Sequence, residues 1–102
     1  MRTRHKSYSD YGFQDGEAKQ LKLYCRSPGL SDHDKFLLKQ ASRQANPSID
    51  ELVYRSIVCK MSYEELQDRD YVPIAKADFY GYQRLCLYWF RQFLTFEGRW
   101  DV

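Results

Sequence analysis

Four side chains in the last third of the sequence are of types that suit hydrogen bonding to nucleotide bases. An Arg side chain can bind both acceptor atoms of guanine, and a Gln side chain can bind adenine through its amide. If a helix begins near residue 76, these side chains occupy its first turns. They are Lys76, Tyr80, Gln83 and Arg84.

A continuous apolar stripe runs along the same predicted helix. Its members follow one another mostly at intervals of three and four residues, which is the spacing of one helix face. We expect that face to lie against the core, which leaves the remaining sides free to contact a partner; the residues on those sides are Lys76, Tyr80, Gln83, Arg84, Leu87 and Arg91. The members of the stripe are Phe79, Tyr82, Cys86, Trp89, Phe90 and Phe93.

A shorter helix is predicted directly before this one. Ser62 and Glu65 have the spacing of a capping box, in which each side chain satisfies a backbone N–H at the start of a helix. Pro73 lacks an N–H and forces the preceding residue out of helical geometry, so the chain must turn there. A short helix, a turn and a long helix over residues 62–94 form the pattern of a helix-turn-helix unit, whose second helix enters the major groove of DNA.

Three further helices are indicated by their start and stop residues. Asp15 and Ser31 are capping types, and Ser48 with Glu51 has the spacing of a second capping box. No segment alternates with the period of a strand. The sequence therefore predicts an all-α fold, a compact bundle of about five helices with a C-terminal helix-turn-helix-like unit. The predicted breaks are Pro28-Gly29, Asn46-Pro47, Lys60-Met61 and Asp70-Pro73.

Length and composition fit a single helical domain over residues 1–102. A chain of 102 residues can bury a core without disulfides or metals, and 43% apolar residues with 17% aromatic residues favour a dense core. Residues 1–13, which are rich in Ser, Arg and Tyr, are predicted to form a loose basic arm. Residues 49–95 are predicted to form the helix-turn-helix-like unit.

The remaining reactive side chains form no catalytic or metal-binding pattern. Cys25, Cys59 and Cys86 are far apart and odd in number, which argues against a disulfide framework and against a zinc site. His33 lies between two Asp residues in the first turn of a predicted helix, where the helix dipole favours acidic residues. No glycine-rich phosphate loop is present. We therefore expect no enzyme activity, no catalytic residue, no metal and no cofactor.

The sequence also predicts where the protein resides. The basic N-terminal residues are not followed by the apolar segment of a signal peptide. The longest apolar run, residues 85–90, is too short to span a bilayer. Cysteines without a pairing pattern fit a reducing compartment. We expect a cytoplasmic protein that has no membrane partner.

The C-terminal half of the sequence resembles the helix-turn-helix of a group of small bacterial regulators. These are ArpU-like or sigma factor region 4-like proteins of phages and mobile elements in low-GC Gram-positive bacteria, in which a Pro-containing turn precedes a Phe-Tyr-rich helix ending in Arg or Lys. The likeness covers residues 49–93 and rests on Pro73-Ile74, Phe79-Tyr80 and Arg84. It implies a DNA-binding transcriptional regulator, and a homodimer would match a two-fold DNA site. The residues implied to contact double-stranded DNA are Lys76, Tyr80, Gln83 and Arg84.

The distribution of charge bears on how DNA would be held. The formal net charge is +2, with nine Lys and Arg against five Asp and Glu in residues 1–49, and four against three in residues 71–102. Affinity for DNA comes largely from Lys and Arg side chains on phosphates. The predicted phosphate contacts are Arg2, Arg4 and Lys6 in the arm, and Arg91.

The weakly charged C-terminal part leaves a second class of function open. The same helical scaffold could present tyrosines and acidic residues to a protein, as in a phage-encoded module that inhibits a host or defence protein. Tyr and Arg are favoured anchors in protein interfaces. A contiguous basic face around Arg84 would favour DNA, whereas a neutral aromatic or acidic face would favour a protein partner.

Overall fold

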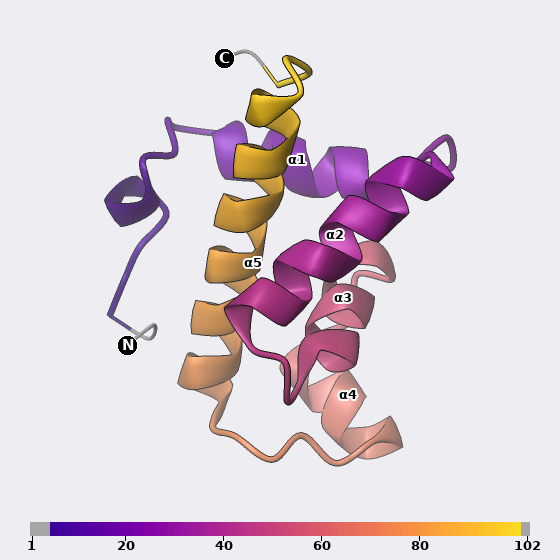
Figure 1. The fold of residues 1–102 in the computed structure, drawn as a ribbon. Helices are drawn as coiled ribbons and strands as arrows, with labels where there is room; N and C mark the ends of the chain where they lie inside the picture. Colours follow the sequence, from indigo (N-terminus) through magenta and orange to yellow (C-terminus); the bar gives the residue numbers. More distant parts are fainter. Residues whose placement is uncertain (1–4, 101–102) are drawn as a thin grey trace.

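The computed structural model describes residues 5–100, and every regular element in this range is helical. A short 3-10 turn precedes five α-helices, and no strand occurs among the described residues (Figure 1). The prediction of an all-α bundle of about five helices is confirmed. The elements are η1 (Ser9–Tyr11), α1 (Glu17–Cys25), α2 (Asp32–Ala45), α3 (Asp50–Val58), α4 (Tyr63–Arg69) and α5 (Lys76–Phe96).

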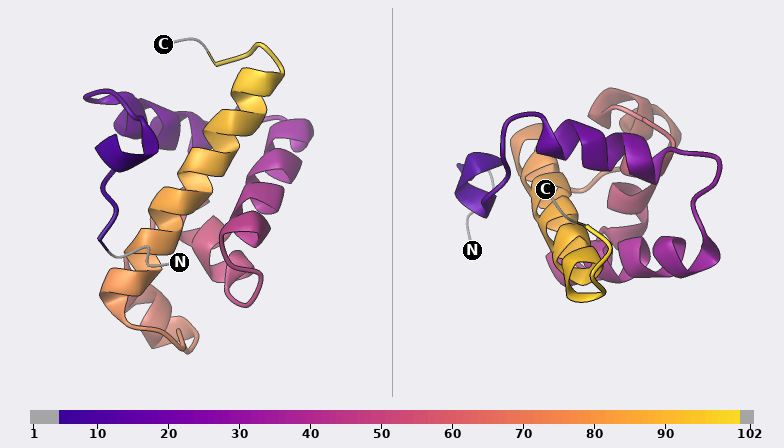
Figure 2. Two further views of the ribbon diagram at one scale, coloured as in Figure 1. Left: turned by 60° about the vertical axis from the view of Figure 1, so that its left-hand side comes forward. Right: turned by 90° about the horizontal axis from the view of Figure 1, so that it is seen from above.

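The long helix α5 is the central element of the bundle. It packs against α1, α2 and α3, and its most extensive contact is with α2. Figures 1 and 2 show α1 crossing behind α5 while α2 lies alongside it. Of the predicted apolar stripe, Phe79, Cys86 and Phe90 are fully buried and the other three members are half-buried. The stripe therefore faces the core, but the core also covers other sides of this helix.

Two of the predicted helix starts are confirmed by their hydrogen bonds. The Ser62 hydroxyl accepts from the Glu65 N–H at 3.1 Å, and the Glu65 carboxylate accepts from the Ser62 N–H at 3.1 Å. At the start of α2, the Ser31 hydroxyl accepts from the Asp34 N–H at 3.1 Å. Each of these bonds satisfies a backbone donor that the first helical turn leaves without a partner.

Two other predicted caps are wrong. Asp15 does not cap α1, because Gly16 occupies the capping position with a left-handed φ of 79°, and the Glu17 carboxylate accepts from the Gln14 N–H instead. Ser48 does not cap α3, which begins after the buried Ile49. At α3, burial of Ile49 at the helix entry overrides the local capping signal.

The N-terminal segment is packed, contrary to the prediction of a loose arm, over its described part. Phe13 is 6% exposed and meets the Tyr8 ring edge-on at 5.4 Å. Arg91 on α5 donates to the carbonyl oxygens of Tyr11 at 2.7 Å and Gly12 at 3.0 Å. Its guanidinium also lies 4.2 Å from the centre of the Phe13 ring. These contacts hold residues 8–13 against α5.

Candidate nucleic-acid interface

The first turns of α5 are engaged with the preceding helix. The Lys76 ammonium pairs with the Glu64 carboxylate at 2.6 Å on the exposed surface. The Tyr80 hydroxyl accepts from the Tyr63 N–H at 3.0 Å. Two of the four predicted base-contacting residues therefore join α5 to the start of α4.

Gln83 does not lie on an outward face, which corrects the prediction. It is 6% exposed, and its Nε2 atom donates to the Ser56 hydroxyl on α3 at 3.0 Å. Leu87, also predicted to lie away from the core, is completely buried. The reason is the central position of α5: helices pack on several of its sides, so residues outside the apolar stripe are also covered.

The connection between α4 and α5 also departs from the usual helix-turn-helix geometry. It covers residues 70–75, which is longer than the turn of about three to four residues in that motif. Gln67 holds the connection through both its amide atoms, which bond the N–H and the carbonyl of Val72 at 3.0 and 3.1 Å. The Tyr63 hydroxyl donates to the Ile74 carbonyl at 2.6 Å. This connection is a structured part of the bundle.

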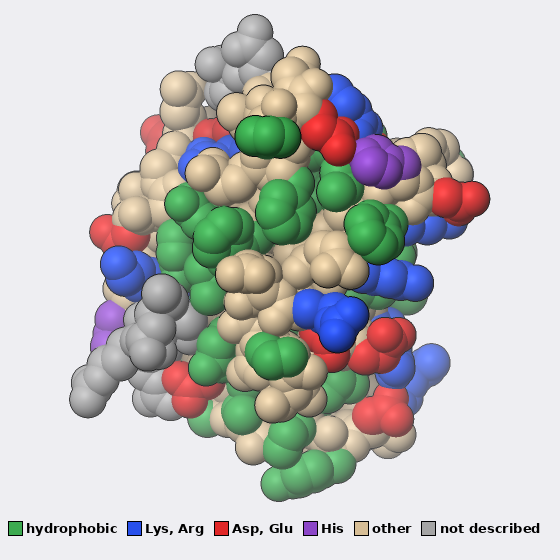
Figure 3. All heavy atoms as spheres, viewed as in Figure 1, with side chains coloured by type: hydrophobic (Ala, Val, Ile, Leu, Met, Phe, Trp, Pro, Cys, Tyr) green, Lys and Arg blue, Asp and Glu red, His purple; other side chains and the backbone are tan. Residues whose placement is uncertain are grey.

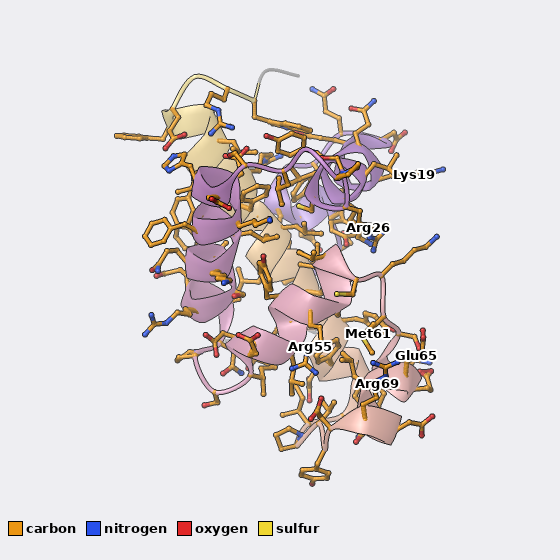
Figure 4. All side chains as sticks on the ribbon, turned by 90° about the vertical axis from the view of Figure 1, so that its right-hand side faces the viewer. Lys19, Arg26, Arg55, Met61, Glu65 and Arg69 are labelled. Atoms are coloured by element: carbon orange, nitrogen blue, oxygen red, sulfur yellow. The ribbon has the colours of Figure 1, made fainter. Side chains whose placement is uncertain are left out.

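A basic groove runs along the exposed side of α1. It is a hollow of about 500 Å³, and its cationic lining residues are Lys19 and Lys22 from α1, Arg26 at the C-terminal cap of α1, and Lys60 just after α3. Figure 4 shows Lys19 and Arg26 on the same side of α1, with Met61 of the neighbouring connection below them. Lys19, Lys22 and the capping residue Arg26 recur at intervals of three and four, which places them on one face of the helix.

A second hollow continues this surface toward the N-terminal segment. It measures about 320 Å³ and is lined by residues 5–8 and Arg84. Tyr8 lines both hollows, so they are neighbours on the surface. We call the two hollows together the Tyr8 groove. Its six Lys and Arg side chains are Lys6, Lys19, Lys22, Arg26, Lys60 and Arg84.

No carboxylate lines the Tyr8 groove among the described residues. Glu17, the acidic residue of α1, points away and is bound by Arg91 at 3.3 Å and by the Trp100 indole N–H at 3.0 Å. Several cations elsewhere are paired with acids, as Arg55 is with Asp70 at 2.5 Å. The groove therefore concentrates positive charge in a chain whose net charge is only +2.

Three of the six cationic side chains of the groove are held by contacts within the fold. The Nε atom of Arg26 donates to the Ile57 carbonyl at 2.8 Å, and that of Arg84 donates to the Lys6 carbonyl at 2.7 Å. Lys22 lies over the Tyr8 ring, with its Nζ atom 5.3 Å from the ring centre. Burial, together with the nearby positive charges of Arg26 and Arg84, lowers the pKa of Lys22.

Lys60 has a backbone conformation that lysine rarely adopts. Its φ is +53°, in the left-handed region, directly after the end of α3. The Met61 N–H donates to the Ser56 carbonyl at 3.1 Å, which is the long hydrogen bond of a Schellman helix end. Glycine is the usual residue at this position because it lacks a Cβ atom. Lysine at this position contributes an ammonium group to the groove.

The sequence identified only part of this surface. Lys6 and Arg84 lie in the groove, whereas Arg91 anchors the N-terminal segment, and Arg2 and Arg4 lie outside the described residues. The α1 cations were missed, although their spacing and the positive excess of residues 1–49 were visible signals. Tyr8 and Lys60 had no such signal, because they join the groove only through tertiary packing.

A different surface is apolar. Figure 3 shows hydrophobic side chains gathered over α2 and α5 on the face turned to the viewer. The exposed large hydrophobic residues of these helices are Phe36, at 56%, and Phe96, at 93%. We call this surface the α2–α5 face.

Comparisons with protein-family models, with curated proteins and with solved structures found no match to this chain. The resemblance to ArpU-like or sigma factor region 4-like regulators stays a prediction. None of the described helices combines the length and apolar character needed to cross a bilayer. Within residues 5–100, no group of three His, Cys, Asp or Glu side chains is arranged to hold a metal ion.

Proposed function

We propose that the protein binds double-stranded DNA and that the phosphate backbone lies along the Tyr8 groove. The observation that carries this proposal is the row of six cations without a lining carboxylate among the described residues. A row of Lys and Arg side chains displaces the cations condensed on DNA phosphates, which is the main source of affinity that does not depend on base sequence.

This proposal changes the expected binding surface. The start of α5 is paired with α4 through Lys76 and Tyr80, and Gln83 is buried, so base contacts from that helix are limited to Arg84. Most of the affinity would come from α1 and the N-terminal segment. A regulator of a phage or mobile element, as the resemblance implies, would use these contacts to position the duplex.

The salt dependence of DNA binding tests the proposal. The variant Lys19→Gln/Lys60→Gln removes two exposed cations from the groove, and Lys35→Gln/Lys39→Gln removes two exposed cations from α2. Both variants change the net charge equally. Gel shifts or fluorescence anisotropy with a duplex should show that the groove variant makes the slope of log affinity against log salt shallower by about 2, at about 0.9 for each phosphate contact.

The control variant should keep the wild-type slope. Absence of duplex binding at low salt, or equal losses in the two variants, would reject the groove as the DNA-binding surface. Equal losses would instead assign the binding to net charge alone.

Binding of a host or phage protein is the second candidate function, and the α2–α5 face supports it. Exposed aromatic side chains are common anchors at protein interfaces. Phe36→Ser/Phe96→Ser should abolish such binding, including formation of a homodimer, whereas Tyr71→Ser, at a residue 79% exposed outside that face, should not. Sedimentation of the protein alone would measure homodimer formation. Sedimentation with an extract of host cells would measure binding of a host or phage protein.

A further inference from the structure

Tyr8 lines both hollows of the groove. Its ring is supported edge-on by Phe13 at 5.4 Å and is covered by the Lys22 ammonium at 5.3 Å. Its hydroxyl oxygen has no hydrogen-bond partner among residues 5–100 and is not sealed from solvent. A buried tyrosine hydroxyl usually bonds to a protein group or to water. Here that donor remains available to a ligand.

Three cations lie near Tyr8: the Lys22 ammonium is over its ring, and Arg26 and Arg84 are close enough to act on the pKa of its hydroxyl. Lys22 and Arg26 share one hollow with Tyr8, and Arg84 shares the other. Arg26 and Arg84 are both fixed by hydrogen bonds from Nε to backbone carbonyls, at 2.8 and 2.7 Å. Arg26 has no ion pair in the part of the chain that the structure describes. The side chains are therefore positioned before any ligand arrives.

The electrostatics of the cluster favour an anion. Burial raises the pKa of Tyr8 to about 12, against the opposing effect of Arg84 and Arg26, so the hydroxyl is protonated at neutral pH and can donate. The pKa of Lys22 is lowered by burial and by the same two guanidinium groups, which shows that these positive charges repel one another. A bound anion would relieve that repulsion.

We propose that Tyr8, Lys22, Arg26 and Arg84 form a discrete site for one phosphate group, with the Tyr8 hydroxyl donating to a phosphate oxygen. Phosphate offers several strong acceptor oxygens and a negative charge, which match three cations and one neutral donor. This inference rests on the proposed function, in which the groove binds the phosphate backbone of DNA. The phosphate would come either from the backbone of a duplex or from a free phosphate ester, and the two sources are separated by experiment.

The first experiment titrates the full-length protein with inorganic phosphate and follows side-chain and backbone signals by NMR. Tyr8→Phe removes only the hydroxyl and keeps the ring that packs on Phe13. Its matched control is Tyr71→Phe, which removes a hydroxyl from a residue 79% exposed on the α4–α5 connection. Saturable shifts at Tyr8, Lys22 and Arg26 are expected. Tyr8→Phe should weaken phosphate binding about tenfold, the effect of losing a hydrogen bond to a charged group, and the control should not.

The second experiment measures duplex DNA binding by the same two variants. Tyr8→Phe should raise the Kd for the duplex without changing the salt slope, because it removes a hydrogen bond but no charge. Lys22→Gln should weaken binding and also make the slope shallower by about 1. Lys35→Gln is the control for loss of one charge. Melting temperatures of all variants establish that each one is folded.

The outcomes separate this inference from the proposed function. Duplex binding with no saturable phosphate shift, and with Tyr8→Phe equal to the wild type, overturns the phosphate site and leaves DNA binding intact. Saturable phosphate binding that requires Tyr8 and Lys22, without any duplex binding, overturns DNA binding and assigns the site to a free phosphate ester. Equal phosphate shifts in the wild type, Tyr8→Phe and Lys22→Gln overturn the site as a specific one.

Discussion

Gln83 of α5 and Ser56 of α3 are hydrogen bonded inside the core, with 3.0 Å between Gln83 Nε2 and Ser56 Oγ. Gln83 is 6% and Ser56 1% exposed, and the Ser56 hydroxyl in turn donates to the Val53 carbonyl at 2.6 Å. This polar pair fixes the register of α5 against α3, because a shift of either helix would leave a buried amide without a partner. A glutamine predicted to contact DNA thus has a structural role.

Replacement of Gln83 should therefore reduce stability rather than DNA affinity. Gln83→Ala is expected to lower the free energy of unfolding by about 2–3 kcal/mol, through the lost hydrogen bond and the space left behind. Gln92→Ala, at an exposed residue of the same helix, should change it by less than about 0.5 kcal/mol. Urea denaturation measures both. Where Gln83→Ala remains folded, its Kd for a duplex should equal that of the wild type; a tenfold rise would restore the residue to the interface.

Much of the fold could be predicted from sequence because its signals are local. The Ser62 capping box and the Pro73 turn act over a few residues, so α4 and the start of α5 were placed correctly. The spacing of apolar residues also identified Phe90 as core. Such spacing marks one buried face, however, and cannot reveal that other helices cover a central helix on several sides. Gln83 was misplaced for that reason.

The candidate site was harder to predict because it is assembled from distant segments. Tyr8, Lys22, Lys60 and Arg84 belong to four different parts of the chain and meet only in the folded bundle. Their charges were visible in the sequence, but their common location was not. The predicted loose arm concealed the role of Tyr8, whose position depends on the packing of Phe13 and on the contacts of Arg91.

Substitution of two phenylalanines of α5 would test which side chains of this helix belong to the core. Phe90 is completely buried and Phe96 is 93% exposed, although both lie on the same helix. Phe90→Ala should lower the free energy of unfolding by about 3–5 kcal/mol because it leaves a cavity. Phe96→Ala should change it by less than about 0.5 kcal/mol. Denaturant melts that give similar values for the two variants would contradict the position of α5 in the bundle.

Asp34 should make the protein sensitive to acid. Arg99 donates to its carboxylate at 2.5 Å and the Tyr24 hydroxyl also donates to it; these contacts outweigh burial and lower the pKa of Asp34. Because the pKa is lower in the folded state, the stabilisation is complete above the unfolded value of about 3.9 and is lost as pH falls through the folded value.

Asp34→Asn should therefore be less stable than the wild type at pH 7 and should show a flatter loss of stability below about pH 4. Asp68→Asn is the control, since Asp68 is exposed and has no hydrogen bond or ion pair within the described range. Thermal melts from pH 7 to pH 2 would measure the difference. Parallel curves for Asp34→Asn and the wild type would show that another group controls the acid transition.

Lys60 is expected to strengthen DNA binding and, at the same time, to lower the stability of the folded protein. At a φ of +53°, the Cβ atom of Lys60 lies too close to the following carbonyl oxygen. This steric strain lowers the stability of the fold by about 1 kcal/mol or more, and glycine avoids it because it has no Cβ atom. Glycine loses more backbone entropy on folding, so the net gain of Lys60→Gly should be about 0.5–1 kcal/mol. The same change removes a cation from the Tyr8 groove and should weaken duplex binding.

The variant Lys60→Ala separates these two effects. It removes the ammonium group but keeps a Cβ atom at the left-handed position, so it should bind DNA as weakly as Lys60→Gly without becoming more stable than the wild type. Urea denaturation and duplex binding at two salt concentrations measure both properties. Wild-type affinity in both variants would place Lys60 outside the interface. A Lys60→Gly protein no more stable than Lys60→Ala would show that the left-handed φ carries no strain. If both expectations hold, a lysine at a position suited to glycine is explained by its contact with phosphate.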